Sequence, residues 1–446
     1  MTARADATPD RFVDPSPWVA APDPLHPPLA GETSADAIIV GGGYAGLAAA
    51  LRLRAAGADV VLLEQAFCGA GASGRNAGHL TPTIGKDIYT CLSHWGEQRG
   101  LALARFGENA VAEAVRLMDE HAIEADYVAA GNVVAGLHPE HRRVLERSAA
   151  RAQAAGLDMA FLDEAEMRGR GLPPAFRCGV REPAGGHLHP GKLVLGLRRA
   201  AHAAGVRIHE GTPATGLRRE RSGRQRVTTP SGAVVAEQAL VATNAYVAPD
   251  LAGLRRSVLP LEVTLFRTAP LTASQRAALG WRGGEGIYTA HEIMESYRIA
   301  PDGRLVGGSK WVRYGAPEQA PVQQADAQKF EALLAERFPE AAPLRIESFW
   351  RGWIAATVDH LPLIGERRGL HMISGCNGHG IALCTTLGAA TADRMLGRRR
   401  DDLEVLRRWL PPLPGEWVRQ AAFRAVAAPL ERRDARIDRQ IRGGEN

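Results

Sequence analysis

The chain has 446 residues, which is more than one simple core usually holds, so two closely joined domains are expected. Its net charge is only +5 and acidic residues are spread among the basic ones, which excludes the concentrated basic surface of a nucleic-acid-binding protein. The five cysteines show neither CxxC pairs nor zinc-ligand spacing, which argues against a disulfide framework or a metal site. No signal peptide or apolar run of ~18 residues occurs, so we expect a soluble, cytoplasmic protein with no membrane span.

The pattern changes abruptly after the first segment. Residues 1–34 are rich in proline and lack periodicity, which predicts an extended arm docked through Trp18. Ala37–Val40 is typical of a short buried strand, Tyr44–Ala56 of a helix, and Asp59–Leu63 of a second buried strand. Strand, glycine turn, helix and strand together predict a βαβ unit.

Later segments alternate between helical and strand patterns. We expect mainly helices over 97–170, a helix over 192–204, a hairpin over 226–242, an antiparallel sheet over 258–312, a strand, glycine turn and helix over 361–391, and a basic helical tail from 411. Because a nucleotide-binding pattern opens this series and a glycine turn with a helix closes it, we predict one domain built from three separated segments. An antiparallel-sheet domain is inserted between them, which gives a mixed α/β fold class.

The segment IIVGGGYAGLAAAL contains a GxGxxG motif directly after the first strand. Gly41 permits the tight turn, Gly43 lets a pyrophosphate approach the backbone, and Gly46 lets the helix pack on the strand. Glu64 follows Gly43 by about 20 residues, where a carboxylate accepts hydrogen bonds from a ribose 2′-OH. The motif predicts dinucleotide binding; the alternative is a glycine turn that only closes an ordinary βαβ unit.

Two further glycine-rich segments favour FAD over NAD. GASGRNAGHL ends at Leu80, and its small residues would let the backbone pass close to a flat ring system. In GLHMISGCNGHGIALCTTLG, a strand over His371–Ser374 leads through a turn over Gly375–Gly380 into a helix. A helix N-terminus stabilises the negative charge of a reduced flavin, which NAD does not require. The alternatives are a flexible surface loop for the first segment and a second βα packing unit for the other.

The combination of these segments resembles the D-amino-acid-oxidase-type (DAO) family of FAD-dependent oxidoreductases, in its γ-glutamylputrescine oxidase and glycine/sarcosine oxidase-like branch. The matching pieces run in order along nearly the whole chain: PSPWVA, GASGRNAGH, GGHLHPGKL, VATNAY, YRIAPDGRLVGG, PLIG and GCNGHGIAL. The resemblance implies a Rossmann-like FAD-binding domain and hydride transfer from an amine carbon to flavin N5. Reoxidation of the flavin by O2 would release hydrogen peroxide.

The resemblance also implies which residues contact FAD. The loop from Arg75 to His79 would lie along the flavin, and Asn377–Gly380 would cover its pyrimidine end. Ala214 would offer backbone to the adenine, and Thr243 with Asn244 would approach the dinucleotide. The full predicted set is Gly41, Gly43, Tyr44, Ala45, Gly46, Glu64, Gln65, Ser73, Gly74, Arg75, Asn76, Gly78, His79, Leu80, Ala214, Thr243, Asn244, Gly375, Asn377, Gly378, His379, Gly380 and Ile381.

We place the FAD-binding domain at 35–95, 185–255 and 345–400, and the substrate domain at 96–184 and 256–344. The arm over 1–34 precedes them, and a basic tail over 401–446 follows.

Two departures from the family pattern affect the chemistry. The stretch RGWIAATVDHLPLIG lacks the cysteine that attaches FAD in some relatives, so FAD is expected to bind non-covalently, with Cys376 as the remaining attachment candidate. Ala382 replaces the lysine that holds a substrate carboxylate in sarcosine oxidase-like relatives, which favours an extended amine such as γ-glutamylputrescine.

Amine oxidation requires the free amine, so the site must favour the neutral form of a group that titrates near ~10. His79, Tyr297 and Trp353 are the candidate catalytic residues, with Tyr288 as a further member of an aromatic cage for an alkylammonium. Lys310 could meet oxygen or a carboxylate. Each of these residues could instead be structural: a satisfied histidine, aromatic core or a solvated lysine.

The sequence is also compatible with other functions. A dehydrogenase or oxidase of the same fold could act on a D-amino acid or N-methyl glycine and pass electrons to another acceptor. The chain could also be a flavoprotein subunit that needs a partner for activity, or a nicotinamide-dependent Rossmann dehydrogenase.

Overall fold

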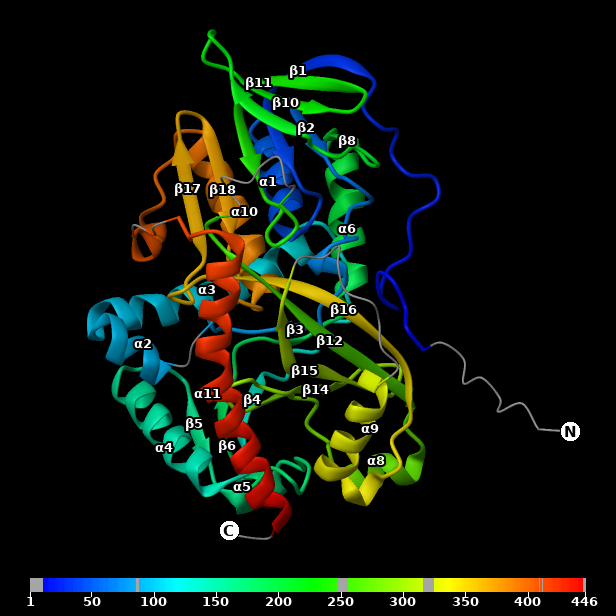
Figure 1. Cartoon of the computed structure of the whole chain (residues 1–446), viewed down its shortest axis with the longest axis vertical. Coiled ribbons are helices and arrows are strands. Elements are labelled where there is room, and N and C mark those ends of the chain that lie inside the picture. The colour runs from blue at the N-terminus through cyan, green and yellow to red at the C-terminus, as the bar shows by residue number, and fades with distance from the viewer. Residues whose placement is uncertain are drawn as a thin grey trace, which may run out of the picture.

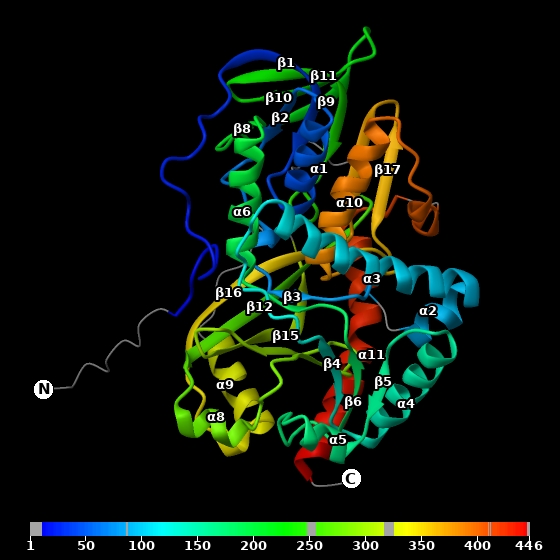
Figure 2. The same cartoon turned by 180° about the vertical axis from the view of Figure 1, so that it is seen from behind.

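The computed structural model describes residues 11–85, 88–247, 256–315, 325–408, 410 and 412–443. Two large β-sheets lie one above the other along the long axis in Figures 1 and 2, with helices packed around each. This arrangement confirms the predicted mixed α/β class. None of the helices in the described ranges is both long and apolar enough to cross a membrane.

The upper sheet has a parallel centre. Its strand order is β17-β18-β11-β1-β2-β8, and β9 and β10 extend β11 as antiparallel neighbours. The bounds are β1 Gly31–Val40, β2 Val60–Leu63, β8 Arg207–His209, β9 Gly216–Arg219, β10 Gln225–Thr229, β11 Gly232–Val241, β17 Leu363–Arg367 and β18 Leu370–Ser374. Val40 pairs in register with Leu63 and with Val241, so three parallel strands end at one edge of the sheet.

Helices pack on this sheet and hold the strand ends in place. They are α1 Tyr44–Ala55, α3 Glu97–Glu120, α6 Pro190–Ala203 and α10 Gly380–Met395. The close approach of α10 to α1 requires a glycine, because a Cβ on Gly388 would lie 2.2 Å from the Ala45 carbonyl oxygen. The start of α1 consequently packs against the middle of α10.

The lower sheet is mainly antiparallel and has the strand order β16-β12-β15-β14-β13-β4-β6-β5. The bounds are β4 Asn132–Gly136, β5 Ala160–Leu162, β6 Cys178–Glu182, β12 Leu259–Pro270, β13 Gly286–Thr289, β14 Ser296–Ile299, β15 Arg304–Tyr314 and β16 Ile346–Ala356. The single parallel pair in this series joins β13 to β4. A two-stranded ribbon of β3 His79–Leu80 and β7 Gly186–His187 lies between the two sheets.

The lower sheet is covered by shorter helices and by the long C-terminal helix. They are α2 Ile88–Trp95, α4 Pro139–Ala154, α5 Glu164–Gly169, α8 Ala273–Leu279, α9 Ala325–Arg337 and α11 Glu416–Gly443, with the 3-10 turn η3 Pro339–Ala341. Two further 3-10 turns, η1 Ala72–Gly74 and η4 Asp401–Leu406, pack on α6 and α3. A core of aromatic side chains, including Phe266, Phe330 and Phe338, fixes α9 against the sheet. Figure 1 shows α11 crossing the front of this sheet.

The N-terminal arm docks through Trp18, as predicted from the sequence. Trp18 is buried and makes edge contacts with Trp350, at 5.4 Å between ring centroids, and with His189, at 5.2 Å. The Ser16 hydroxyl donates a hydrogen bond to the Gly74 carbonyl. The arm therefore braces the loop that carries Gly74 against the upper helices and β16.

Several boundaries differ from the sequence prediction. Strand β1 begins at Gly31, inside the predicted arm, because residues 31–36 pair with the start of β11. The segment 97–170, predicted as mainly helical, also contains β4 and β5, which are short and pair with β6. The predicted hairpin, the antiparallel sheet after 258 and the C-terminal helix are all present. Strand β16 pairs with β12 of the lower sheet, whereas the predicted third segment of the cofactor domain starts at residue 345. The domain boundaries stay a prediction.

Candidate functional site

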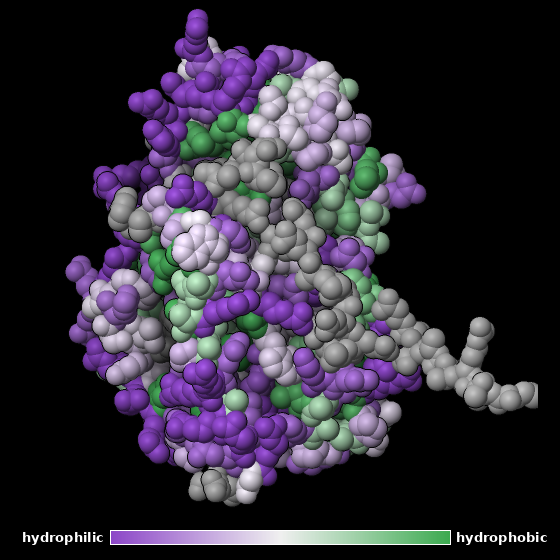
Figure 3. All heavy atoms as spheres, in the orientation of Figure 1, coloured by the Kyte–Doolittle hydropathy of each residue, from purple (hydrophilic) through white to green (hydrophobic). Residues whose placement is uncertain are grey.

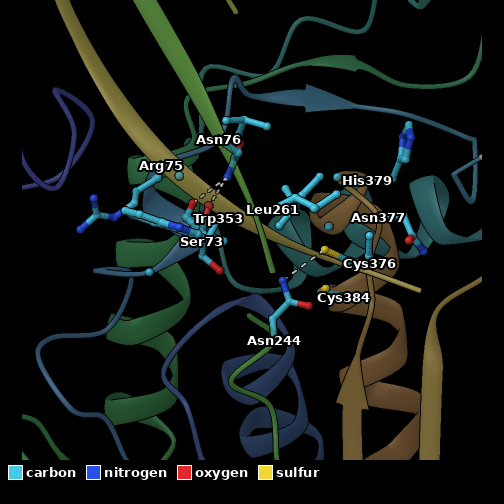
Figure 4. A pocket seen from close by; sticks show the side chains of 18 of the residues that line it. Ser73, Arg75, Asn76, Asn244, Leu261, Trp353, Cys376, Asn377, His379 and Cys384 are labelled. Carbon is cyan, nitrogen blue, oxygen red and sulfur yellow. Dashed lines mark hydrogen bonds between the residues drawn. The ribbon is translucent and has the colours of Figure 1, made fainter. Parts of the chain in front are cut away.

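A cavity of about 590 Å³ lies between the two sheets, at the edge where β1, β2 and β11 end. Its lining comes from segments far apart in the sequence: the turn after β1, the loop before β3, the turn before α10, β12 to β16, and α11. Figure 4 shows side chains of the loop 73–76, of Asn244 and of the turn 376–379 arranged around it. The size lies within the range of small-molecule and cofactor sites.

The first glycine turn has the geometry that the motif predicts. Gly41 has φ +110°, and a Cβ there would lie 2.8 Å from the Ala242 carbonyl oxygen. A Cβ on Gly43 would lie 2.8 Å from the Ser73 hydroxyl, so a side chain at this position would collide with the loop that lines the cavity. Gly46 faces the strand, because its Cβ would lie 1.9 Å from the Gly41 carbonyl oxygen. Gly41 and Gly43 thus line the cavity, while Gly46 only permits close packing.

Glu64 lies at the end of β2, where the sequence predicts a carboxylate. Its two oxygens accept hydrogen bonds from the backbone N–H of Gly42, at 2.8 Å, and of Ala66, at 3.0 Å. Burial raises the pKa of Glu64, although the backbone N–H donors oppose this shift. Gln65 and Ala214 line the cavity beside it. This end can offer a carboxylate oxygen and backbone groups to a ligand.

The loop before β3 is held rigidly by its own side chains. The Asn76 amide donates to the carbonyls of Ser73, at 2.8 Å, and Ala72, at 3.1 Å, and accepts from the Gly78 N–H at 2.9 Å. Arg75 turns away from the cavity floor to Asp14, with 2.7 Å between nitrogen and oxygen. The loop therefore presents mainly backbone and small side chains to the cavity.

The second glycine turn connects β18 to α10. Asn377 has φ +50°, and its side chain accepts from the Thr357 N–H and donates to the Gly375 carbonyl. Asn244 accepts from the Gly375 N–H at 3.1 Å, which joins the end of β11 to this turn. The ring of His379 contacts the Thr81 and Thr83 hydroxyls, and burial lowers its pKa to about 4. The N-terminus of α10, which has no side-chain cap, opens on the cavity.

His79, Tyr288 and Ser296 form the inner end of the cavity. The His79 and Tyr288 rings lie 5.0 Å apart, and Tyr288 is the cross-strand partner of Ser296. The Tyr288 and Ser296 hydroxyls are buried without a hydrogen-bond partner, and neither ring nitrogen of His79 makes a hydrogen bond of normal geometry, although Asn132 lies beside the ring. Burial, with the nearby charge of Arg298, holds the pKa of His79 well below its usual range, and burial raises the pKa of Tyr288. These neutral polar groups can hydrogen-bond a ligand.

Most of the predicted site residues lie around this cavity. Those lining it are Gly41, Gly43, Tyr44, Ala45, Glu64, Gln65, Ser73, Arg75, Asn76, Gly78, His79, Ala214, Thr243, Asn244, Asn377, Gly378, His379, Gly380 and Ile381, together with Trp353 and Tyr288. Gly46, Gly74, Leu80 and Gly375 lie behind the lining and serve packing or turn geometry.

The structure does not bring two of the predicted residues into the cavity. Tyr297 faces the aromatic core of the lower sheet, 5.2 Å from Phe338 between ring centroids, and its hydroxyl donates a hydrogen bond to the Glu295 carboxylate. Lys310 is buried, with its ammonium 2.8 Å from Glu295 and 2.9 Å from Asp438. Both side chains thus belong to a buried network under α11, and neither lines the cavity.

Sequence reasoning missed several lining residues. One is Cys384, which pairs with Cys376, the residue considered from the sequence only as an attachment candidate for FAD. Asn244 donates to the Cys376 sulfur, and the hydrogen bond with Cys384 lowers the pKa of Cys376 to about 7. The other group comprises residues of the lower sheet and α11: Leu261, Val263, Glu292, Met294, Ser296, Val312, Phe423, Val426, Ala427 and Leu430. For the residues of α11, the spacing of apolar residues in the C-terminal tail could have indicated a helix with one buried face.

Residues 36–394 match the family described as FAD dependent oxidoreductases, abbreviated DAO. The "Probable oxidoreductase OrdL" of Rhizobium meliloti (strain 1021) is 29% identical over 399 residues, which cover 88% of this chain and 90% of that protein. The "Gamma-glutamylputrescine oxidoreductase" of Escherichia coli (strain K12) is 28% identical over 404 residues, which cover 88% of this chain and 91% of that protein. Both similarities extend over nearly the whole length of the relatives.

Solved structures share the fold. Glycine oxidase from Geobacillus kaustophilus superposes with a TM-score of 0.73 at 22% identity, over 85% of this chain and all of that one. L-proline dehydrogenase from P. horikoshii superposes with a TM-score of 0.70 at 18% identity, over 83% of this chain and 96% of that one. At these identities the likeness establishes the fold alone.

Proposed function

Because the chain belongs to the DAO family of FAD-dependent oxidoreductases, we propose that it oxidises a C–N bond of an extended amine, with O2 as the electron acceptor and hydrogen peroxide as a product. It is an enzyme of the class that acts on CH–NH or CH–NH2 groups. The inner end of the cavity carries this proposal. It offers neutral hydrogen-bonding groups to an amine, and among its described lining residues His79, Tyr288 and Ser296 none carries a permanent positive charge for a carboxylate.

The cavity fits FAD, the cofactor of the family. Gly41 and Gly43 leave room at the N-terminus of α1, where a side chain would collide with Ala242 or Ser73. Glu64 would hold the adenosine end, and the N-termini of α1 and α10 suit negatively charged groups. Non-covalent binding is supported by the absence of a cysteine from the stretch RGWIAATVDHLPLIG. Bound FAD supplies the acceptor for the hydride; the chain supplies binding, orientation and a dry environment.

The inner end favours the neutral form of an amine. His79 is neutral because burial and the charge of Arg298 depress its pKa, and Tyr288 keeps its proton because burial raises its pKa. Burial by itself disfavours the ammonium form of an amine, although the nearby charge of Glu182, which also acts on Tyr288, opposes this effect. The unpartnered hydroxyls of Tyr288 and Ser296 can hydrogen-bond the amine nitrogen and so fix the adjacent carbon.

The charge of the lining argues against an amino-acid substrate. Among the lining residues in the described ranges, Arg75 is the one side chain with a permanent positive charge, and it is bonded to Asp14 and to backbone carbonyls. The guanidinium of Arg298 lies behind the loop, bonded to the Ala77 carbonyl. A buried carboxylate without a cationic partner is costly, so a substrate with a carboxylate next to the amine should bind poorly. The similarity to the γ-glutamylputrescine oxidoreductase supports an extended amine instead.

The test compares kcat/KM for γ-glutamylputrescine, putrescine, sarcosine and D-alanine, followed as hydrogen peroxide release under air. We expect one of the first two to be preferred. A tenfold or larger preference for sarcosine or D-alanine, ~1.4 kcal/mol in transition-state terms, would refute the substrate class. Flavin reduction without oxygen consumption would show that the enzyme is a dehydrogenase that passes electrons to another acceptor.

A further inference from the structure

Helix α11 forms one side of the cavity at its mouth. Ala422, Phe423, Val426, Ala427 and Leu430 line the cavity, and their spacing of three or four residues places them on one face of the helix. Val426 is 66% exposed, which places this part of the lining next to solvent. The region matched to the family ends at residue 394, so the wall lies beyond the matched part of the chain.

The strands next to this wall also present apolar side chains. The Phe423 ring contacts Tyr314, at 5.8 Å between centroids, and Tyr314 is the cross-strand partner of Leu261. Val263 pairs with Val312 two positions along the same strands, and Leu261, Val263 and Val312 all line the cavity. The mouth is therefore apolar, whereas the inner end at Tyr288 and Ser296 is polar.

The C-terminal half of α11 is firmly anchored. Asp434 accepts hydrogen bonds from the N–H groups of Glu292 and Ile293, at 3.0 and 2.9 Å, and both of these residues line the cavity. Asp438 is buried against Arg337 and Lys310. These contacts fix the helix to the loop beside the cavity, so the position of its apolar face is set by the fold.

Pro429 separates this anchored half from the half that carries most of the wall. Proline has no N–H, so the helix lacks one backbone hydrogen bond at this point. Residues before Pro429 are largely exposed, whereas Asp434, Ile437 and Asp438 after it are buried. In Figure 3 the lower part of the face that α11 crosses is mostly hydrophilic, which agrees with its outward arginines.

We propose that the cavity-facing side of α11, with Phe423, Val426 and Leu430, determines substrate specificity; we call it the specificity wall. It selects amines in which an apolar chain of several methylene groups is attached to the nitrogen. The proposal rests on the function proposed above and names the substrate class more closely. The amine lies at the polar inner end, and the arm runs along the apolar face of α11 toward solvent. Affinity then rises with the length of the arm, because each methylene leaves water.

The experiment uses the holoenzyme and the series n-butylamine, n-hexylamine and n-octylamine. Binding is measured without oxygen from the perturbation of the flavin absorbance, and the limiting rate of flavin reduction is recorded separately. For a fully buried arm, we expect affinity to increase by roughly threefold to fourfold per methylene. Phe423→Ala and Val426→Asp should each weaken octylamine binding at least tenfold and butylamine binding less than threefold. Val426 is largely exposed, so its substitution leaves folding intact.

The matched control is Arg424→Ala, an exposed position on the same helix turn that does not line the cavity. It should leave the whole series unchanged. Affinity that is independent of chain length, binding undetectable at every length, or equal losses for butylamine and octylamine in the Phe423 and Val426 variants would overturn the specificity wall. Length-dependent binding without flavin reduction by any amine would instead overturn the proposed oxidation and leave the apolar wall in place.

Discussion

Replacing Asp438 by alanine should release α11 from the lower sheet. Asp438 accepts from Arg337 at 2.6 Å and lies 2.9 Å from the Lys310 ammonium, and Glu295 bonds the same two cations. Two buried carboxylates thus balance two buried cations. The substitution removes one carboxylate and leaves a buried positive charge uncompensated.

The expected loss is large because the group is buried. Asp438 has a side-chain exposure of 11% and Arg337 of 1%. Removing one partner of such a pair costs about 3–5 kcal/mol, whereas an exposed pair contributes about 0–1 kcal/mol. Asp434 still holds the helix to the loop, so the lower end of the range is expected. About 3 kcal/mol corresponds to roughly a 100-fold change in the opening equilibrium of the helix.

Amide hydrogen exchange of the holoenzyme measures this opening directly in peptides from α11. The Asp438→Ala variant should exchange roughly 100-fold faster there and be unchanged in the peptides of α1 and β2. Arg442→Ala is the control, because its ion pair with Glu336 is about half exposed on the arginine side. Acceleration below fivefold in α11, or equal acceleration in both variants, would refute the reasoning that this buried network anchors the helix.

The remaining predictions concern the cofactor and the same anchor. Acid precipitation should release the yellow colour from the protein; colour retained in the washed pellet would show a covalent bond and implicate Cys376. Glu64→Ala should weaken FAD binding by roughly 1.5–3 kcal/mol in a titration of the apoprotein, with little change in the rate of the fully loaded enzyme; unchanged affinity would refute the ribose assignment. Sulfite at millimolar concentration should bleach the visible flavin absorbance, because the N-terminus of α10 stabilises negative charge; no bleaching would favour a dehydrogenase. Burial alone would raise the pKa of Asp438, but the His291 hydrogen bond and the charges of Arg337 and Lys310 hold this pKa well below its usual range. The contribution of Asp438 to stability is therefore present above pH ~4 and is lost as the pH falls further. Hydrogen exchange of α11 that accelerates between pH 7 and 5 would contradict this.

The glycine turns could be predicted from the sequence because their constraints are local. A turn from a strand into a phosphate-binding helix requires a positive φ at the position of Gly41 and leaves no room for a side chain at the position of Gly43. The spacing from this turn to Glu64 follows from the length of the βαβ unit. The contacts of the loop at Asn76 are equally local, since its side chain bonds residues two to four positions away. Such features need no knowledge of the rest of the fold.

Tyr297 shows what sequence alone could not decide. Successive side chains of a strand point to opposite faces, so either Ser296 or Tyr297 of β14 faces the cavity. The larger aromatic was the natural choice for an amine cage, yet the pairing with β13 turns Ser296 and Tyr288 toward the cavity and Tyr297 into the core. Which face of β14 lines the cavity and which lies in the core depends on the pairing of all strands in the lower sheet. The role of α11 was hidden for the same reason, because its docking through Asp434 is a contact over 140 residues.

The position of the N-terminal arm has a consequence for the biosynthesis of the protein. The arm is synthesised before the strand on which it docks: Trp18 packs on Trp350, and the Val13 N–H donates to the Phe349 carbonyl, more than 300 residues later in the chain. During synthesis, the loop at Gly74 can fold with the early βαβ unit, whereas the arm that braces it has no complete binding surface until β16 has emerged. The docking of the N-terminal arm is thus a late event of folding, and the loop beneath it remains unbraced until β16, at Ile346–Ala356, has been made.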